Sequence, residues 1–408
     1  MKLLQINVTA NNGSHGVIAE EIGRLAISRG WESWIAYGRE PHKPSDSNLI
    51  KIGNKFDFYR HAILTRLFDF HGLSSKAATK ELVEKIKGIE PDIIHLHNIH
   101  GYYLNYRILF EYLKNCSTKV VWTFHDCWPM TGHCPHFMFE GCEKWKYKCE
   151  KCPLKGEYPK SVFFDNSRYN FDLKKKLFTS LGNRLTIVPV SKCVEGYARD
   201  SFFKDCNIHQ IYNGIDLDEF KILSDQKEKM VLGVANFRDR RKGLHDFYKL
   251  RELLPKEYKI VLVGVSSKQI ENLPDGIIGI ARTTNKSELA VLYSKAIAFV
   301  NPTYNDNFPT TNLEALACGT PVIVYRTGGS PEAIDEKTGI VVEQGDIEGI
   351  SNAIKLIESS EDCFLPEMCR DRAILNYGKK QRFEDYLSLY DTIPVSYTHL
   401  TLPTNSLV

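Results

Sequence analysis

The chain has 408 residues, of which 43% are hydrophobic and 25% are charged, which suits two globular domains and is not typical of a disordered protein. Its 53 basic and 50 acidic residues leave a net charge of +3, so the bulk charge argues against a nucleic-acid-binding protein. No apolar run reaches the roughly 20 residues that span a bilayer, and the apolar start, MKLLQINV, is too short for a signal peptide. We therefore expect a cytoplasmic protein.

The first half of the chain alternates short β-rich runs with helical patterns. Leu3–Val8 is an apolar run, and the loop NNGSHG at residues 11–16 leads from it into a helical pattern that closes on Gly30. Further strands are expected at Trp34–Tyr37, Ile93–His97, Lys119–Phe124 and Leu185–Val190, with helices such as Ala77–Lys87 and Asn105–Leu113 between them. This alternation predicts a doubly wound parallel sheet.

A second series of the same kind begins near Lys229. Strands are expected at Met230–Ala235, Tyr258–Val263, Ile297–Val300 and Pro321–Tyr325, and a last helix at Lys379–Tyr390. We therefore predict an α/β protein with two Rossmann-like domains that face a central cleft. The first domain is assigned to residues 1–212, the second to 213–376, and a helix at 377–394 crosses back to the first.

The last residues, 395–408, contain the string VSYTHLTLPT, which resembles the translation of a transposase sequencing adaptor. We interpret them as a non-native tail and leave them out of the fold prediction. The alternative is a genuine polar tail.

The most informative segment is NPTYNDNFPTTNLEALACGTPVIVYRTGGSPEAI, residues 301–334. It predicts the end of a strand, a loop, and a helix that begins near Thr311, with Thr310 or Thr311 as the N-cap. The free amides of the first helical turn would face the cleft and suit a diphosphate. Glu314, one turn further, can accept two hydrogen bonds from a ribose diol. The alternative is an ordinary capped helix with a solvated glutamate.

This segment resembles the E-x7-E signature of family-4 retaining glycosyltransferases, which have the GT-B fold. Glu314 takes the position of the second glutamate, and Asp306 stands in place of the first. The resemblance implies that Glu314 holds the nucleotide ribose and that Asp306 holds hydroxyl groups of the transferred sugar. It also implies that the diphosphate meets the backbone of the loop formed by Phe308, Pro309, Thr310 and Thr311. Aspartate is one methylene shorter than glutamate, so its reach to the sugar differs from the family pattern.

The stretch VLGVANFRDRRKGLHDF resembles the R-x5-K-G element of the same family. Lys242 and Gly243 match this element, whereas Asn236 occupies the arginine position. A fixed cation is needed because the leaving diphosphate gains charge as the glycosidic bond breaks. A solvated basic loop is the alternative. The missing guanidinium can come from Arg238, our first candidate, or from Arg240 or Arg241.

Two further segments extend the resemblance around the donor. The stretch at 277–293 resembles the part of the family whose backbone meets the nucleobase, so Arg282 and Thr283 are candidate contacts. In the loop after the first strand, Gly13 and Gly16 permit close approach of the backbone to a ligand. The resemblance implies that this loop lies over the diphosphate and the acceptor. Many α/β domains begin with such a loop without binding a ligand there.

His125 follows the predicted strand KVVWTF and therefore stands at the carboxyl end of a strand, where open α/β sheets bind their ligands. The resemblance implies that this histidine touches the donor sugar. The alternative is a histidine with a purely structural role.

A cysteine-rich loop is expected at residues 125–159. Cys134, Cys142, Cys149 and Cys152 have seven, six and two residues between them, and four thiolates can form a closed tetrahedral zinc site. A long loop without secondary structure needs such a staple, so we predict one structural zinc ion. The alternatives are free buried cysteines, or ligands drawn from Cys127, His133 and His136. Some bacterial family-4 enzymes that act on surface polysaccharides resemble this chain here and in HLHNIHGYY, residues 95–103.

These observations together predict a retaining glycosyltransferase that works without a catalytic metal. The resemblance implies transfer of a sugar from a nucleoside-diphosphate sugar to a glycan or lipid-linked acceptor in capsule or lipopolysaccharide synthesis. The alternatives are a catalytically impaired sugar-nucleotide-binding protein, a sugar epimerase on the same fold, and a nucleic-acid binder built on the cysteine loop.

The aromatic and basic helix at 55–70 either rests on the inner face of the cytoplasmic membrane or packs in the core. Asp216–Asp218 spells D-x-D, which we interpret as a turn.

Overall fold

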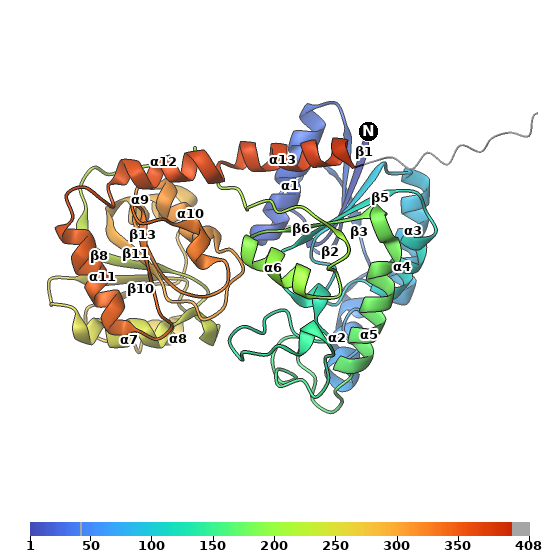
Figure 1. The fold of residues 1–408 in the computed structure, drawn as a ribbon, viewed down its shortest axis with the longest axis horizontal. Helices are drawn as coiled ribbons and strands as arrows, with labels where there is room; N and C mark the ends of the chain where they lie inside the picture. Colours follow the sequence, from blue (N-terminus) through green and yellow to red (C-terminus); the bar gives the residue numbers. More distant parts are fainter. Residues whose placement is uncertain (41–42, 394–408) are drawn as a thin grey trace, which may run out of the picture.

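The computed structural model describes residues 1–40 and 43–393. Two α/β domains lie side by side, and two helices near the C-terminus run along both of them (Figure 1). None of the helices in this part of the chain is long and apolar enough to cross a membrane. The tail predicted at 395–408 lies outside the described residues.

The first domain is built on a seven-stranded sheet in the order β3-β2-β1-β4-β5-β6-β7, with all neighbours parallel. Its strands are β1 (Lys2–Thr9), β2 (Glu32–Arg39), β3 (Asn48–Lys51), β4 (Ile93–Leu96), β5 (Lys119–Phe124), β6 (Leu185–Pro189) and β7 (Asn207–Ile208). Its helices are α1 (Gly13–Ser28), α2 (Lys55–Phe68), α3 (Lys76–Ile89), α4 (Tyr106–Lys114), α5 (Ser167–Phe178) and α6 (Lys192–Asp200). The strand order reverses between β1 and β4, which creates a crevice at the carboxyl ends of the strands.

The second domain has a six-stranded parallel sheet in the order β10-β9-β8-β11-β12-β13. Its strands are β8 (Glu228–Val234), β9 (Lys259–Val263), β10 (Ile277–Ile280), β11 (Ala296–Asn301), β12 (Val322–Tyr325) and β13 (Gly339–Val342). Its helices are α7 (Leu244–Leu253), α8 (Ser267–Ile270), α9 (Lys286–Lys295), α10 (Thr310–Ala317) and α11 (Ile347–Ser359). Here the order reverses between β8 and β11, so both sheets have a crevice of the same kind. The predicted pair of doubly wound domains is confirmed.

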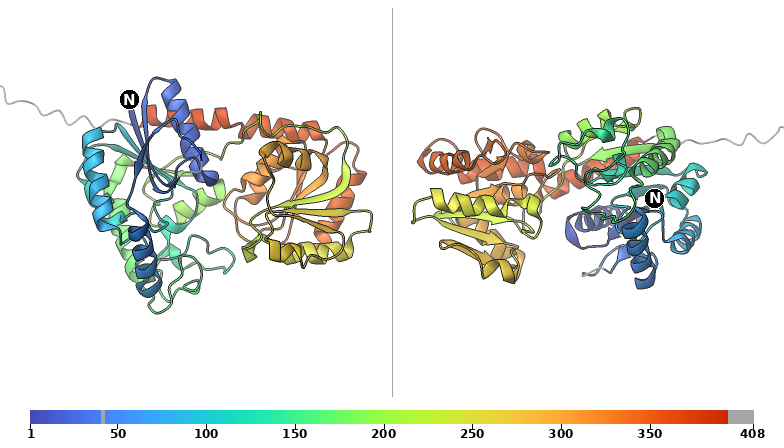
Figure 2. Two further views of the ribbon diagram at one scale, coloured as in Figure 1. Left: turned by 180° about the vertical axis from the view of Figure 1, so that it is seen from behind. Right: turned by 90° about the horizontal axis from the view of Figure 1, so that it is seen from below.

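The last two helices join the domains. α12 (Pro366–Tyr377) packs against α10 of the second domain, and α13 (Lys379–Thr392) packs against α1 of the first (Figures 1 and 2). The apolar side chains of α13, such as Tyr386 and Leu387, are buried with Leu3 and Ile18. The predicted return of the C-terminal helix to the first domain is therefore confirmed.

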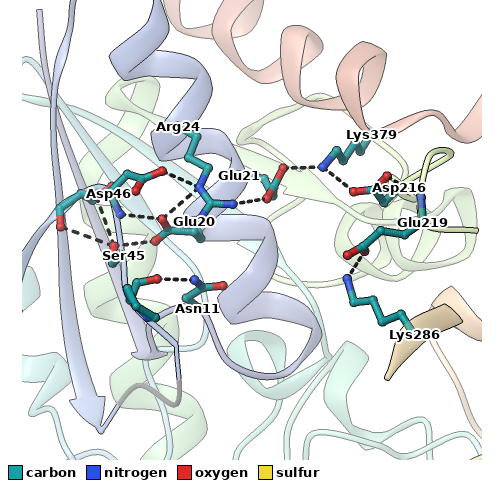
Figure 3. Close-up of polar contacts among 12 residues, drawn as sticks. Asn11, Glu20, Glu21, Arg24, Ser45, Asp46, Asp216, Glu219, Lys286 and Lys379 are labelled. Atoms are coloured by element: carbon teal, nitrogen blue, oxygen red, sulfur yellow. Dashed lines mark hydrogen bonds and ion pairs between the residues drawn. The ribbon is translucent and has the colours of Figure 1, made fainter. Parts of the chain in front are cut away.

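An ion-pair cluster lies where the chain crosses between the domains. The Nζ of Lys379 lies 2.9 Å from Oε2 of Glu21 on α1 and 2.6 Å from Oδ2 of Asp216 (Figure 3). The other carboxylate oxygen of Asp216 accepts hydrogen bonds from the backbone amides of Asp218 and Glu219. The D-x-D string is thus a turn whose first carboxylate holds the crossing helix.

Candidate active site

A cavity of about 270 Å³ lies between the two sheets. Its walls come from residues just after strands of both domains, including His125 after β5 and Asn301 at the end of β11. Of the residues predicted from the sequence, those that line it are His125, Lys242, Asp306, Phe308, Pro309, Thr310 and Thr311. The polar residues that sequence reasoning missed are Ser14, Asn213 and Asn301. Asn236, which stands where the resembled element has arginine, also lines the wall.

The amino end of α10 faces this cavity. The helix begins at Thr310 and its N-cap is Pro309, which makes no side-chain hydrogen bond to the helix. The predicted threonine cap is therefore wrong, because both threonines already belong to the first helical turn. The amide of Asn312 donates to the carbonyl oxygen of Pro309 (3.2 Å). The amides that precede it at the start of the helix have no carbonyl behind them to bond, and the helix dipole adds a partial positive charge. This end of α10 can therefore receive an anionic group.

Glu314 lies one turn into α10 and is partly buried. Its Oε2 accepts a hydrogen bond of 3.0 Å from the hydroxyl of Tyr293 on α9. Burial raises the pKa of Glu314 from 4.5 to about 7, while the Tyr293 bond and the Lys286 charge act in the opposite direction. Lys286 is itself paired with Glu219 (Figure 3). The Glu314 carboxyl is thus a poorly solvated acceptor, and it lies outside the residues that line the cavity.

Lys242 and Asp306 form an ion pair, with 2.5 Å between Nζ and Oδ2. Each side chain is only 21% exposed. The loop of Lys242 can approach the loop of Asp306 because residue 243 is glycine, where an added Cβ would lie 2.2 Å from the carbonyl oxygen of Pro302. This close approach explains why a glycine follows Lys242, because any side chain at residue 243 would collide with Pro302. The two predicted residues, 64 positions apart in the chain, meet at the cavity wall.

The arginines near Lys242 do not reach the cavity wall. Arg238 is exposed and lies outside the lining residues. Arg241 is turned toward Asp239, with 3.0 Å between its Nε and Oδ1 of the aspartate. Asn236 stands at the position where the resembled element has arginine, and among residues 1–40 and 43–393 Lys242 is the basic side chain that lines this cavity.

The loop after β1 contributes through Ser14 rather than through its glycines. Gly13 has a φ of +67°, which favours glycine, and an added Cβ on Gly16 would lie 2.7 Å from Oγ1 of Thr9. The close approach at Gly16 is therefore made to the end of β1. Arg282 and Thr283, after β10, also lie outside the cavity lining.

His125 is held from two sides. Its Nε2 lies 3.0 Å from Nδ1 of His97, and its carbonyl oxygen accepts a 2.9 Å hydrogen bond from the side chain of Asn307 in the second domain. Burial lowers the pKa of His125 well below the usual value, so the ring is neutral. The bond from Asn307 places this histidine at the point where the two domains touch.

The zinc site predicted at Cys134, Cys142, Cys149 and Cys152 is not supported. Across residues 1–40 and 43–393, no group of three or more histidine, cysteine, aspartate or glutamate side chains is placed to hold a metal ion. The four cysteines do line one small cavity. A hydrogen bond between Cys134 and Cys152 raises the pKa of the Cys134 thiol and lowers that of Cys152.

Other contacts order the cysteine loop. The ammonium group of Lys174 on α5 is buried beneath it and donates to the carbonyl oxygens of Trp128 (2.8 Å) and Thr131 (2.9 Å). The same nitrogen lies 3.3 Å from the centre of the Trp128 ring. His133 forms a buried pair with Asp69 at 2.6 Å. These side chains hold the loop in place, a role that the sequence analysis assigned to a metal ion.

Comparisons with known proteins agree with this architecture. Residues 15–219 match the family model described as Glycosyltransferase Family 4, and residues 214–380 match the one described as Glycosyl transferases group 1. The chain is 26% identical to the putative colanic acid biosynthesis glycosyl transferase WcaC of Escherichia coli (strain K12), over 96% of this chain and 100% of the relative. It is 29% identical to N,N'-diacetylbacillosaminyl-diphospho-undecaprenol alpha-1,3-N-acetylgalactosaminyltransferase of Campylobacter jejuni, over 43% of this chain and 47% of that protein.

Two solved structures share the fold. Sucrose-phosphate synthase from Thermosynechococcus elongatus superposes with a TM-score of 0.70 at 20% identity, covering 96% of this chain and 98% of that one. Anabaena HepE in complex with UDP superposes with a TM-score of 0.67 at 12% identity, covering 96% and 100%. The predicted GT-B architecture is thereby confirmed. With a Glycosyltransferase Family 4 domain followed by a Glycosyl transferases group 1 domain, the chain belongs to the glycosyltransferases.

Proposed function

We propose that this protein transfers a sugar, with retention of anomeric configuration, from a nucleoside-diphosphate sugar to a glycan or lipid-linked acceptor in bacterial surface-polysaccharide synthesis. The observation that carries this is the interdomain cavity, where the amino end of α10, the Lys242–Asp306 pair and His125 meet. The names of the colanic acid and diphospho-undecaprenol relatives support the acceptor class. The UDP complex of the structural neighbour supports the donor class.

The donor is held mainly by the second domain in this proposal. The diphosphate lies against the amides of the first turn of α10, where the helix dipole favours negative charge. The ribose diol donates to the Glu314 carboxylate, which already holds the Tyr293 hydroxyl. The sugar then extends toward Asp306 and His125, which line the same cavity.

The reaction breaks the bond between the anomeric carbon and the diphosphate oxygen, and the bonding electrons leave with that oxygen. Lys242 and the α10 amides stabilise the charge that develops there. The acceptor hydroxyl attacks from the face that the diphosphate leaves, and its proton passes to the departing phosphate oxygen. This route needs no protein nucleophile, and Asp306, the one carboxylate among the described residues that line the cavity, is paired with Lys242.

Turnover of a panel of labelled UDP-, GDP- and ADP-sugars tests the proposal, with NMR of the product to assign its anomeric configuration. We expect one donor to be consumed only when an acceptor is present, and the product to keep the configuration of the donor. Brief treatment with EDTA should leave turnover unchanged. An inverted product would contradict retention. Tight binding without turnover would favour the binding-protein alternative, and a new product without acceptor would favour an epimerase.

We also propose that the first domain meets an anionic membrane surface through an aromatic patch on α2 and the neighbouring loop. This patch consists of Phe56, Tyr59, Ile63, Val162, Phe163 and Phe164, whose side chains are all exposed. The two segments are joined because the amide of residue 162 donates to the carbonyl of Arg66 (2.8 Å) and Phe68 stacks on the ring at 164. The same two segments carry exposed basic residues, namely Lys55, Arg60, Arg66 and Lys160. An apolar patch with a basic margin suits a bilayer that contains anionic lipid.

Flotation with vesicles tests this contact. The protein should float with vesicles of phosphatidylethanolamine and phosphatidylglycerol more than with phosphatidylcholine alone. Phe163→Asp should reduce flotation, because it places a charge in the patch, whereas Leu375→Asp, at an exposed position on α12, serves as a control. Equal flotation of all three proteins, or none by the wild type, would contradict the proposal.

A further inference from the structure

A chain of hydrogen bonds leads from the first strand of the first domain to His125. The side chain of Gln5 on β1 donates from Nε2 to the carbonyl oxygen of Ala19 (2.7 Å), and its Oε1 lies 3.0 Å from Nε2 of His97. Nδ1 of His97 lies 3.0 Å from Nε2 of His125. Gln5 and His97 are buried. The three residues stand on or just after the neighbouring strands β1, β4 and β5, so the sheet fixes their spacing.

The surroundings of this chain determine where each proton lies. A carbonyl oxygen can only accept, so the amide nitrogen of Gln5 must face Ala19 and its oxygen must face His97. His97 therefore carries a proton on Nε2. Burial lowers the pKa of His97 well below its ordinary value, so the ring is neutral and its Nδ1 is an acceptor. It follows that His125 donates from Nε2 and has a lone pair on Nδ1.

The Nδ1 atom of His125 is the part of the ring left for a ligand. It has no hydrogen-bond partner among residues 1–40 and 43–393. It is also absent from the buried side-chain atoms of these residues that lack a partner, so it is not shut away from solvent. The residue itself lines the interdomain cavity. We propose that Gln5 and His97 are positioning residues that hold His125 as the Nε2–H tautomer, so that Nδ1 accepts a hydrogen bond from a hydroxyl of the transferred sugar. This inference rests on the proposed function, because it requires a donor sugar in the cavity.

The fixed tautomer has a consequence for substrate choice. A neutral histidine with its proton on Nε2 can accept at Nδ1 but cannot donate there, so that atom offers nothing to the oxygens of the diphosphate. It favours instead a sugar that presents a hydroxyl group at this place. A donor sugar that lacks the hydroxyl group at this position would leave the Nδ1 lone pair without a hydrogen bond. The free-energy cost of such an unpaired group is one way in which enzymes reject analogues.

NMR of the free wild-type protein labelled with ¹⁵N-histidine tests the tautomer without any substrate. We expect the His125 proton on Nε2, with a scalar coupling across the hydrogen bond to Nδ1 of His97. The spectrum of His125→Gln identifies the signals. A proton on Nδ1 of either His97 or His125 would overturn the proposal, whether or not the enzyme turns over any sugar.

The variant Gln5→Met removes the acceptor that orders His97 while it keeps the length of the side chain. We expect a second population with the proton on Nδ1 of His97, and a fall of about 3- to 10-fold in kcat/KM for the donor found in the panel, the scale for one hydrogen bond. Binding of UDP alone, which carries no sugar, should change less than about twofold. The control is His61→Gln on α2, which removes another buried histidine bonded on both sides.

The control variant should lower stability without changing the His125 signals or kcat/KM. If Gln5→Met has the predicted spectrum but full kcat/KM, the positioning role is wrong while the glycosyltransferase function stands. If no donor is turned over by the wild type, the proposed function fails, and the spectrum of the free protein still decides the tautomer. If Gln5→Met does not fold, the wild-type coupling remains the deciding measurement.

Discussion

Replacing Glu314 by glutamine should stabilise the free protein and weaken its binding of nucleotide. In the folded chain the pKa of Glu314 is raised from 4.5 to about 7. A raised carboxyl pKa means that the folded state prefers the protonated form, so its contribution to stability is complete below about pH 4.5 and is lost as the pH rises through 7. Glutamine resembles the protonated form and does not titrate.

The size of the effect follows from this shift. A difference of about 2.5 units at about 1.4 kcal/mol per unit gives at most about 3 kcal/mol. The stability difference grows as the pH rises from the unfolded pKa to the folded pKa, because the wild-type carboxyl ionises over this range. Glu314→Gln should therefore exceed the wild type in free energy of unfolding by about 1 kcal/mol at pH 5 and about 3 kcal/mol at pH 8.5. The hydrogen bond from Tyr293 can be kept, because the glutamine carbonyl also accepts.

Urea denaturation followed by circular dichroism at several pH values measures this difference. Glu348→Gln, at an exposed position on α11, controls for the general loss of a negative charge. UDP binding by calorimetry should be weaker in Glu314→Gln by about 1.5–3 kcal/mol, the scale for a hydrogen bond to a charged group. A stability difference that does not change with pH, or a variant that binds UDP as tightly as the wild type, would refute the reasoning.

Five further substitutions, at four residues, test the remaining parts of the site and the loop. Lys242→Ala should lower kcat by roughly 10²–10³-fold, the scale for one preorganised charge stabiliser, and wild-type turnover would make it a surface residue. Asp306→Asn should lower kcat/KM by about 1.5–3 kcal/mol, and Asp306→Glu should be milder; equal effects near zero would place the residue outside the donor site. Lys174→Met should lower the free energy of unfolding by about 3 kcal/mol, because it leaves the carbonyls of Trp128 and Thr131 without their donor. Cys149→Ser should lower the free energy of unfolding by less than Lys174→Met does in the same denaturation assay. The reverse order would mean that the cysteines contribute more than Lys174 to the stability of the loop.

Much of the fold could be predicted because parallel strands buried on both faces leave continuous apolar runs. The runs at 3–8, 93–97 and 119–124 became β1, β4 and β5. The strands that sequence reasoning missed, β3, β7, β10 and β13, have only two to four residues, and each of them lies at an edge of its sheet. An edge strand buries less surface, so its apolar pattern is weak. The threonine cap failed for a different reason: several positions in the run of residues 309–311 could begin the helix, and the helix begins at Thr310 with Pro309 as the cap.

The sequence by itself determined the two domains and the part of the site that comes from local motifs, because spacing along one loop or helix turn fixes where Asp306, Phe308 and Glu314 lie relative to one another. Only the tertiary structure decided the partners of those residues. Lys242 meets Asp306 across 64 positions, and Gln5 meets His97 across 92. Cysteine spacing suggested a metal, yet Lys174 reaches the loop from α5. Contacts over such separations depend on how strands are ordered in a sheet and helices are laid on it, and no local pattern of residues encodes that order.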